Sequence, residues 1–486
     1  MRLDHPSRGI RSRLSQSALL IAVAFGLSAC AGTNGIQPQA KLRDASSLNL
    51  PADPTAIPEM EAQWWRAFGD EQLNSLVEQA LAANPSLKIA QTRLARAQAG
   101  IDVTAAATGP QLNASVEATR QLFTGKGMIP PPYGGTILES GTAQLSGSWE
   151  LDFFGKNRAA LDAALGSTRA AQADAEAARM LLASNVARSY FSLVRLNEQL
   201  GVANRLLAQR EQTLRLVRDR VNAGLDTRLE LLQGEGGLPE ARLQIETVQE
   251  QLALTKNGLS ALIGEPNRPL ALVLPAQSAI KNIVTSTVLP SDLLGRRPDI
   301  AAARWRVEAA TQEVGNAKSQ FYPNINLVAF AGFSSIGLDQ LFDAGSRQWG
   351  VGPALRLPLF DGGRLRANLR GKTADLDAAI ESYNAAVIDA VRDVADQLAS
   401  TQSIARQQTE QRAALASAEH AHDIAVQRYD AGLVNFLSVL NAETSVLNQR
   451  RQAVDLSARA LDTQVALMRA LGGGYRADLP ASIAQK

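Results

Sequence analysis

The sequence predicts a mainly α-helical fold with a small β part of the kind found in membranes, and it predicts that the whole plan occurs twice. Residues 156–222 and 364–431 are long runs without proline, rich in Ala, Leu, Arg, Gln and Glu, which are good helix formers. At ~1.5 Å per residue, one helix of either length spans about 100 Å. Each run follows stretches in which apolar and polar residues alternate, as in strands with one apolar face.

Four short motifs recur in the same order, which indicates an internal duplication. Residues 84–85, 109–113, 151–155 and 220–225 correspond to residues 297–298, 322–326, 357–361 and 428–433. The separations are 213, 213, 206 and 208 residues, so the two copies differ by one short insertion in the first. Two copies are too few for a solenoid, and they predict pseudo-symmetry within one architecture.

The lower half of the first long run carries a heptad pattern. Apolar residues recur at alternating steps of three and four, and Arg210 is the single polar member. The positions are Leu193, Leu196, Leu200, Ala203, Leu207, Arg210, Leu214, Val217 and Val221. Such a narrow stripe predicts a partner helix along one side, and a generic coiled-coil rod is the alternative that this segment leaves open.

The N-terminus predicts a secreted protein with a lipid anchor. Four arginines precede an apolar stretch at residues 18–27, and Leu27-Ser28-Ala29-Cys30 follows. Cys30 is the only cysteine, so it cannot form a disulfide within the chain, and its place at the expected cleavage point fits a lipoprotein motif. We therefore expect a signal peptide at 1–29 and a lipid on Cys30. An ordinary signal peptide with an incidental cysteine is the alternative.

The mature chain divides into a tether, two repeats, a linker and a tail. We expect the tether at 30–70, the first repeat at 71–264, the linker at 265–290, the second repeat at 291–472 and the tail at 473–486. Trp64, Trp65 and Phe68, near the end of the tether, require a surface to pack on. Prolines mark the linker, and a glycine closes each repeat.

The sequence of each repeat predicts a helix, two strands, a long helix and a return helix. In the first repeat we expect helices at 71–83, 85–106 and 156–222, a return helix ending at 262, and strands at 111–119 and 144–151. In the second we expect helices at 300–320, 364–431 and 436–471, and strands at 325–331 and 349–357. Asp226 or Thr227 can cap the first return helix, and its glycines and proline at 234–239 predict a kink. Pro353 and Pro358 fall in or beside the last strand, where proline cannot donate to the ladder.

The expected lengths fit together. A return helix of ~35 residues and a preceding helix of ~22 residues would span about 52 and 33 Å, which end to end nearly match one long helix. Four strands cannot close a barrel, and lipid does not tolerate open sheet edges. Strands that lie in a membrane must therefore form a barrel shared between chains. Soluble hairpins give the same alternation and are the alternative.

The sequence contains no pattern typical of an enzyme or of nucleic-acid binding. The formal charge of +2 becomes −1 without the first 29 residues, which hold 4 Arg and 1 Asp, so no basic excess remains. His420 and His422 lie two apart on a helix and point in different directions, with no further ligands to complete a metal site. Residues 371–373 read Gly-Lys-Thr, but Arg366 stands where a phosphate loop has its first glycine. We expect no metal, and no cofactor except the lipid on Cys30.

Six stretches, in order along nearly the whole mature chain, carry a family resemblance. They are residues 64–68, 82–87, 293–300, 321–323, 358–363 and 428–433, among them Trp64-Trp65-Arg66-Ala67-Phe68 and Pro358-Leu359-Phe360-Asp361-Gly362-Gly363. Together they resemble the outer-membrane efflux channels of the TolC-like family, in the lipoprotein branch that partners resistance-nodulation-division pumps. The six stretches together point to this family more specifically than any one of them does alone.

The resemblance implies a mainly α trimeric α/β-barrel. Three copies would supply a barrel of twelve strands in the outer membrane and a tunnel of long helices across the periplasm. It also implies a periplasmic adaptor (membrane fusion) protein docked on the helix–turn–helix tips, and an inner-membrane pump that supplies the energy. Ala31, which follows Cys30, implies sorting of the lipoprotein to the outer membrane.

The resemblance assigns roles at the far end of the helical hairpins. The tips expected to contact the adaptor are Arg220, Gly224 and Leu225 in the first repeat and Arg428, Gly432 and Leu433 in the second. The periplasmic aperture is expected at Glu230, Ser438 and Asn441. The family often presents acidic rings there, but this chain has Ser438 and Asn441, which leaves Glu230 as the acidic candidate and does not support an inherited cation block.

The sequence therefore predicts a passive exit duct for drugs or other small toxic compounds, in multidrug resistance. The alternative is a lipid-anchored periplasmic coiled-coil scaffold or adaptor without a pore. The alternating strands favour the duct, because a scaffold has no need of strands with an apolar outer face.

Overall fold

The computed structural model describes residues 32–43, 61–266, 269–283 and 293–476. The expected signal peptide, Cys30, and parts of the expected tether, linker and tail lie outside these residues. The chain divides into two compact units. The first contains Met1–Leu42, Ala95–Ala170 and Ala303–Tyr383, and the second contains Arg43–Leu94, Ala171–Ala302 and Asn384–Lys486. Each unit has its own hydrophobic core.

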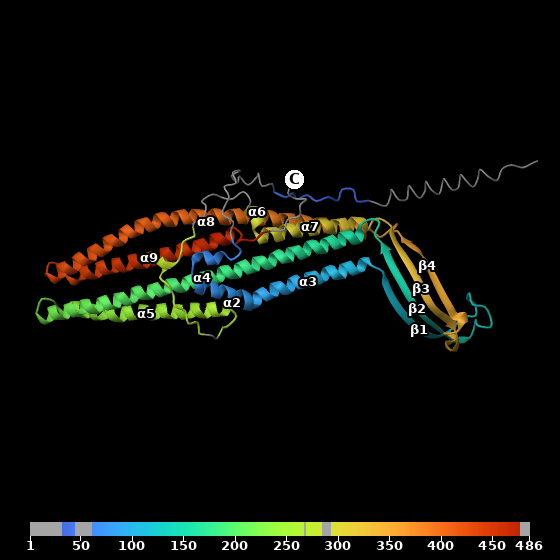
Figure 1. The fold of residues 1–486 in the computed structure, drawn as a ribbon, viewed down its shortest axis with the longest axis horizontal. Coiled ribbons are helices and arrows are strands. Elements are labelled where there is room, and N and C mark those ends of the chain that lie inside the picture. Colours follow the sequence, from blue (N-terminus) through green and yellow to red (C-terminus); the bar gives the residue numbers. More distant parts are fainter. Residues whose placement is uncertain (1–31, 44–60, 267–268, 284–292, 477–486) are drawn as a thin grey trace, which may run out of the picture. The chain divides into compact units, whose positions relative to one another are not determined.

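A four-stranded antiparallel sheet forms the β part of the first unit (Figure 1). Its strands are β1 (Gln111–Leu122), β2 (Ile137–Leu151), β3 (Asn324–Ile336) and β4 (Arg347–Arg356), hydrogen-bonded in that order. All four extend beyond the predicted bounds at one end or both. Their outer parts lack the apolar alternation and are held by polar cross-strand pairs instead, such as Arg120 opposite Glu139.

The register places the alternating apolar residues that the sequence predicts in all four strands on one face of the sheet. Leu145 lies opposite Ala331, and Ala331 lies opposite Trp349 on the next strand. The apolar side chains Val116 and Val351 on this face are 80% and 65% exposed. The sheet has two open edges, at β1 and β4.

Pro353 lies within β4, and Pro358 lies beyond its end. The edge strand tolerates Pro353, because an edge strand has a side where no neighbour needs the missing N–H. β4 ends at Arg356, one residue before the predicted end.

The helices match the predicted plan closely. They are α2 (Glu71–Ala83), α3 (Pro85–Thr108), α4 (Lys156–Asn222), α5 (Arg228–Leu262), α6 (Leu293–Arg296), α7 (Pro298–Ser319), α8 (Arg364–Asp430) and α9 (Phe436–Ala470), with short 3-10 turns at Trp64–Phe68, Gln277–Ala279, Leu338–Gln340 and Ala344–Ser346. α4 and α8 have 67 residues each. α4 has the predicted ends, and α8 ends one residue earlier than predicted. α5 continues through Pro239, and a bend there remains a prediction.

The first unit packs α7 against α8 beside the sheet. Val314 of α7 and Phe321, two residues beyond its end, are buried with Leu369 of α8 in one cluster, which Ile36 from the N-terminal segment joins. The backbone N–H groups of residues 39 and 40 both donate to Asp377 Oδ1 at 2.9 Å. Part of the predicted tether therefore lies along α8 as a fixed strap.

The second unit buries the predicted aromatic cluster. Trp65 and Phe68 are 1% and 0% exposed and pack in the same core as Tyr190 and Phe191 of α4. Asp70 caps α2 through the N–H groups of residues 72 and 73, and it also accepts a hydrogen bond from the Tyr190 hydroxyl at 2.5 Å. The surface that these aromatic residues required is the middle of α4.

The return helices end against the residues that precede α3 and α7. The Asn84 side-chain amide donates to the carbonyl of Leu262 at 2.8 Å, and Arg297 Nη1 donates to the carbonyl of Ala470 at 3.3 Å. Both contacts satisfy carbonyls that a helix C-terminus leaves without partners. The last residues of α5 and α9 are therefore hydrogen-bonded to the residues just before α3 and α7.

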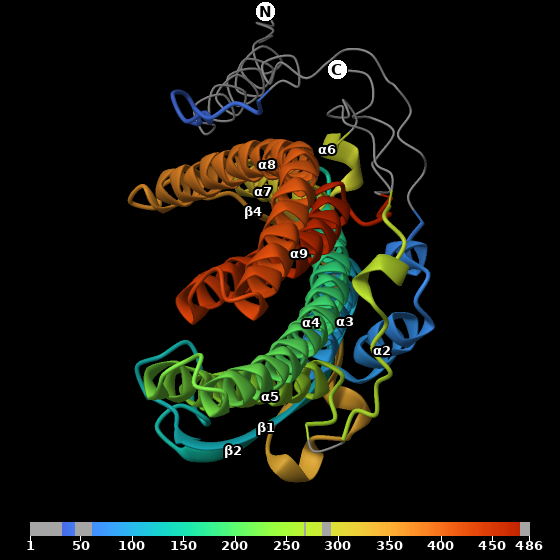
Figure 2. The same cartoon turned by 90° about the vertical axis from the view of Figure 1, so that its left-hand side faces the viewer.

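The long and return helices run side by side in pairs, α4 with α5 and α8 with α9 (Figures 1 and 2). Five of the nine predicted heptad positions on α4 are buried: Leu193, Leu196, Ala203, Leu214 and Val217. Among the described residues, no helix is both long enough and apolar enough to cross a bilayer.

Candidate functional site

The first helical hairpin ends in a glycine turn. Gly224 follows α4 with φ of 73°, the left-handed region that favours glycine. The Leu225 N–H donates to the Arg220 carbonyl at 2.9 Å, which satisfies one of the last carbonyls of the helix. The glycine is therefore required by the backbone, whatever else the tip contacts.

The second hairpin ends in the same way. Gly432 has φ of 74°, and the Leu433 N–H donates to the Arg428 carbonyl at 2.8 Å. Leu225 and Leu433 are 66% and 67% exposed, so each tip presents an uncovered apolar side chain.

The Arg220 side chain fastens the two tips together. Its Nε donates to Asp226 Oδ2 at 3.0 Å, and its Nη1 donates to the carbonyl of Asp430 at 3.1 Å. The guanidinium lies 4.6 Å from the ring centroid of Tyr429, whose hydroxyl donates to Asp226. The side chains of Arg220 and Asp226 are only 11% and 10% exposed, so this network is shielded from water.

The network shifts the pKa values of its members. Burial acts to raise the pKa of Asp226, but hydrogen bonds from Arg220 and Tyr429 outweigh it and hold that pKa below its usual value. The hydrogen bonds to Asp226 raise the pKa of Arg220, and burial together with Asp226 raises the pKa of Tyr429. Asp226 therefore stays ionised and the tyrosine stays neutral near pH 7.

Arg428 occupies the matching place in the second tip, but its side chain does something different. It is exposed, and it has no ion-pair partner among the described residues. Val434 stands where Asp226 stands in the first repeat, so the second tip lacks the counterpart of that carboxylate. Of the two tip arginines, Arg220 is used inside the chain and Arg428 is free to contact a partner.

The predicted aperture residues lie at the starts of the return helices. Glu230 belongs to a capping box with Thr227, whose backbone N–H and hydroxyl both donate to it. These hydrogen bonds with Thr227 lower the pKa of Glu230. Ser438 is the counterpart of Glu230 and donates from its N–H and hydroxyl to Asn435 Oδ1, at 3.3 and 3.0 Å. Asn441 is exposed.

The polar position of the heptad pattern lies in a cluster that ties α4, α5 and α9 together. Arg210 Nε pairs with Glu443 at 3.1 Å, and Nη1 pairs with Glu240 at 3.3 Å and donates to the Gly237 carbonyl at 2.6 Å. The Glu443 side chain is 6% exposed. Burial raises the pKa of Glu443, and Arg210 acts in the opposite direction.

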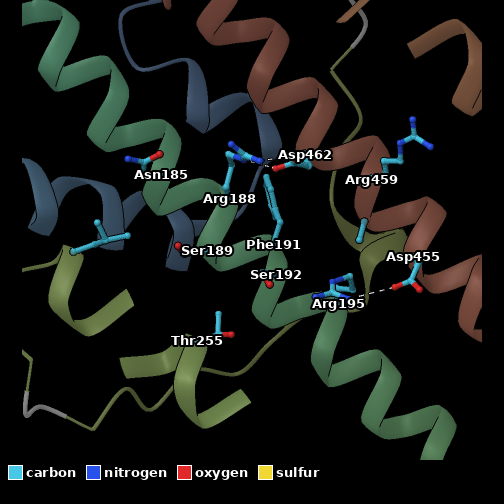
Figure 3. A pocket seen from close by; sticks show the side chains of 12 residues that line it. Asn185, Arg188, Ser189, Phe191, Ser192, Arg195, Thr255, Asp455, Arg459 and Asp462 are labelled. Carbon is cyan, nitrogen blue, oxygen red and sulfur yellow. Dashed lines mark hydrogen bonds and ion pairs between the residues drawn. The ribbon is translucent and has the colours of Figure 1, made fainter. Parts of the chain in front are cut away.

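A polar cavity of about 720 Å³ lies between α4, α5 and α9, farther from the tips than the Arg210 cluster (Figure 3). Arg188 of α4 pairs with Asp462 of α9 at 2.5 Å, and Arg195 pairs with Asp455 at 3.4 Å. The two arginines are seven residues apart on α4, and the two aspartates are seven residues apart on α9. The two ion pairs are therefore stacked along the antiparallel helices. The small side chains of Ser189, Ser192 and Ala458 are among those that line the cavity.

Groups that could hold a metal ion are absent from the part of the chain that the structure describes. His422, one of the two histidines outside the signal peptide, lies 2.8 Å from Gln209 through its Nε2 and is part of the helix packing. Cys30 lies outside the described residues, so its expected lipid stays a prediction.

Sequence reasoning missed two members of the tip network. The sequence offers Asp226 as a possible helix cap, but Thr227 is the cap and Asp226 pairs with Arg220. Tyr429 lies within the repeated motif at residues 428–433, which gives no sign of this contact. One signal could have found them: Asp226 and Tyr429 are polar where their repeat counterparts, Val434 and Val221, are apolar.

Comparison with known proteins identifies the family. The model of the family described as "Outer membrane efflux protein" matches residues 76–265 and 289–473, which cover most of both repeats. The putative multidrug resistance outer membrane protein MdtQ of Escherichia coli K12 is 33% identical over 462 residues, covering 91% of this chain and 96% of that protein. The multidrug resistance outer membrane protein MdtP of Shigella flexneri is 31% identical, covering 86% of this chain and 87% of that protein.

Comparison with solved structures gives the same family. The outer membrane protein VceC of Vibrio cholerae matches with a TM-score of 0.80 and 37% identity, covering 85% of this chain and 99% of that one. The outer-membrane channel OprN matches with a TM-score of 0.81 and 28% identity, covering 91% and 97%. Two tandem helical hairpins with a four-stranded sheet, matched over nearly the whole length of these proteins, show that the chain belongs to the outer membrane efflux protein family.

Proposed function

We propose that this chain is the exit duct of a tripartite efflux pump, through which drugs or other small toxic compounds pass from the periplasm to the exterior. The chain is an outer-membrane efflux protein and not an enzyme. The observation that carries the proposal is the two-faced sheet. Its apolar face suits lipid and its polar face suits a water-filled lumen.

The open edges of the sheet support a homotrimer. Four strands are too few to enclose a lumen, and the free edges at β1 and β4 must be paired if the sheet lies in lipid. Three copies supply twelve strands, enough for a channel. The partner that the edges require is therefore a further copy of the same chain.

The tips support docking of a periplasmic adaptor. They present Leu225, Leu433 and the free guanidinium of Arg428 at one end of the hairpins. The adaptor would couple the duct to an inner-membrane pump of the resistance-nodulation-division type, which supplies the energy. Glu230, Ser438 and Asn441 would line the aperture just inside the tips.

Cys30 would carry the lipid that anchors the chain in the outer membrane. The strap that follows it lies on α8 in the same unit as the sheet. A lipid at this end of the strap would assist insertion, while the sheet alone would hold the protein in the membrane.

Extraction of the Cys30→Ala variant tests the proposal against the alternative of a lipid-anchored scaffold. An exit duct lacking its lipid still needs detergent to leave the membrane, because the apolar face of the sheet remains in lipid. A scaffold without a pore would be released by buffer alone. In cells, deletion of the gene should sensitise the bacterium to the exported compounds, and the wild-type gene should restore resistance.

A further inference from the structure

We propose that the duct holds a binding site for aromatic anions at the end of the sheet where its strands pass into the long helices. The inference rests on the proposed exit duct and names a class of compound that the duct itself binds. β2 leads into α4 and β4 leads into α8 at this end (Figure 1). A cavity of about 470 Å³ lies there, lined by these two turns and by the turn between α7 and β3. Small-molecule sites in proteins have cavities of this size.

Three of the strand residues that line the cavity lie on the polar face of the sheet. Arg356 of β4 is paired with Asn324 of β3, and the next pair along, Leu355 with Ile325, belongs to the apolar face. Successive residues of a strand point to opposite faces, so Arg356 and Asn324 point to the polar one. Glu150 of β2 shares their face by the same alternation. Under the proposed function, this is the face that lines the lumen.

The charges around the cavity favour an anion. Three cations and two carboxylates line it, a formal balance of +1 (3 − 2): Lys156, Arg356, Arg364, Glu150 and Asp152. Both carboxylates are already used within the chain. Lys156 Nζ donates to the two oxygens of Glu150 at 2.9 and 3.0 Å, and Asp152 accepts the backbone N–H of residue 158 at 2.8 Å.

Arg356 and Arg364 are the two cations of the cavity that remain without a carboxylate. Both are exposed, and neither forms an ion pair within the part of the chain that the structure describes. Asp361 lies in the same turn as Arg364, but its two oxygens accept the N–H groups of Gly363 and Leu365, at 2.9 and 2.8 Å. A guanidinium binds a carboxylate through two parallel hydrogen bonds, so these two side chains are suited to an acidic ligand.

A stacked pair of rings supplies the apolar part of the site. Phe154 and Tyr322 both line the cavity, with their ring centroids 5.0 Å apart and 11° between the ring planes. Each residue is 45% exposed, so the pair still has ring surface to offer. Aromatic rings favour a further ring in an offset or edge-to-face arrangement, which a saturated compound cannot reproduce. The ligand class that fits both the arginines and the rings is a flat aromatic carboxylate.

Binding to the wild-type protein in a nonionic detergent tests the ligand class. A ligand-observed NMR titration should show saturable binding of naphthoate, with empty micelles as the blank. Naphthamide keeps the rings without the charge and should bind about tenfold more weakly, the loss of one charge-assisted hydrogen bond. Decahydronaphthoate keeps the charge without the aromatic rings and should also bind more weakly, because it cannot stack. Equal binding of naphthoate and either matched compound would overturn the proposed class.

Substitutions test the residues. Arg356→Gln combined with Arg364→Gln should weaken naphthoate binding by about tenfold or more, and Tyr322→Leu should weaken it by a smaller factor. Replacing both arginines by lysine keeps the charges and should restore part of the binding. Arg347→Gln is the matched control, since this exposed arginine lies at the other end of β4. Native mass spectrometry checks that each variant keeps the wild-type oligomer. Equal binding by the Gln pair and by the control would overturn the site.

The outcomes separate this site from the duct that it rests on. A wild-type protein that is oligomeric and confers resistance, but binds naphthoate no better than naphthamide, would overturn the aromatic-anion site and leave the exit duct standing. A wild-type protein that is monomeric in detergent, or whose deletion leaves resistance unchanged, would overturn the duct and the site together.

Discussion

Asp226 is the residue on which the fastening of the two tips depends. It accepts hydrogen bonds from Arg220 of its own hairpin and from Tyr429 of the other. The exposed tip residues Leu225, Leu433 and Arg428 have no such partners and suit contact with another protein. Neighbouring residues at the tips thus divide between those that hold the hairpins together and those that are exposed.

Replacing Asp226 should loosen the tips. Asp226→Asn removes the charge that Arg220 and Tyr429 bind, and charge-assisted hydrogen bonds contribute about 1.5–3 kcal/mol each. The free energy of local opening at residues 219–230, measured by hydrogen exchange, should fall by an amount of that order. Asp430→Asn is the matched control, since this side chain is exposed and only its backbone carbonyl is used. Equal exchange in both variants would contradict the fastening role.

The same carboxylate predicts a pH dependence of tip stability. The folded state lowers the pKa of Asp226, so its contribution is present above the unfolded pKa of about 3.9 and is lost as pH falls through the lowered folded value. Hydrogen exchange at the tips, corrected for the intrinsic rate, should therefore show constant protection from Asp226 between about pH 5 and 8. A loss of this contribution near neutral pH would be inconsistent with an ionised Asp226.

Gly432 offers a direct test of adaptor docking. Gly432→Val forces a β-branched residue to φ of 74°, at a cost of about 1–3 kcal/mol of local strain. The tip should distort while the trimer survives, and resistance conferred by the intact pump should drop. Gly236→Ala, inside α5 with no neighbouring atom in the way, should leave resistance unchanged. Unchanged resistance in Gly432→Val would remove the docking role from this tip.

Elements were predictable where local chemistry decides their ends. Both ends of α2, α4 and α9 lie within one residue of prediction, because proline, glycine and capping residues bound them. The strands ran longer than predicted, since their outer parts depend on cross-strand pairs such as Arg120 with Glu139. The tip network and the strap at Ile36 involve residues far apart in sequence, which periodicity cannot relate.

The cluster of Arg210 with Glu240 and Glu443 predicts that removing Arg210 makes the stability of the protein depend on pH. Arg210→Ala leaves the buried Glu443 without its closest cation, so its already raised pKa should rise further. Stability of the variant should be greatest below the unfolded Glu pKa of about 4.3 and should fall as pH rises through the folded value. Its melting temperature should be lower at pH 8 than at pH 5, relative to wild type. Arg242→Ala, which removes a 62% exposed arginine, should show no such dependence.

The two faces of the sheet predict opposite responses to charge. Val116→Lys places an ammonium on the apolar face, where lysine in lipid costs about 2–4 kcal/mol near the bilayer midplane, and folded protein in the outer membrane should decrease. Ser115→Lys, one residue earlier on the polar face, should be tolerated. The measurement is the amount of heat-modifiable, membrane-inserted protein for each variant. Equal loss in the two variants would contradict the assignment of the faces.

At the scale of the whole molecule, the described chain leaves strand edges and apolar side chains exposed. Its sheet has open edges at β1 and β4, and Leu232, Leu243 and Leu254 of α5 are exposed. Under the proposed function, further copies of the chain would cover both. Family membership was predictable from sequence because the matching motifs span both repeats.

The mass of the purified Cys30→Ala protein tests this account most directly. Measured by native mass spectrometry, the protein should require detergent to stay in solution and should have the mass of three chains. A monomer that dissolves in plain buffer would contradict both the shared barrel and the outer-membrane duct.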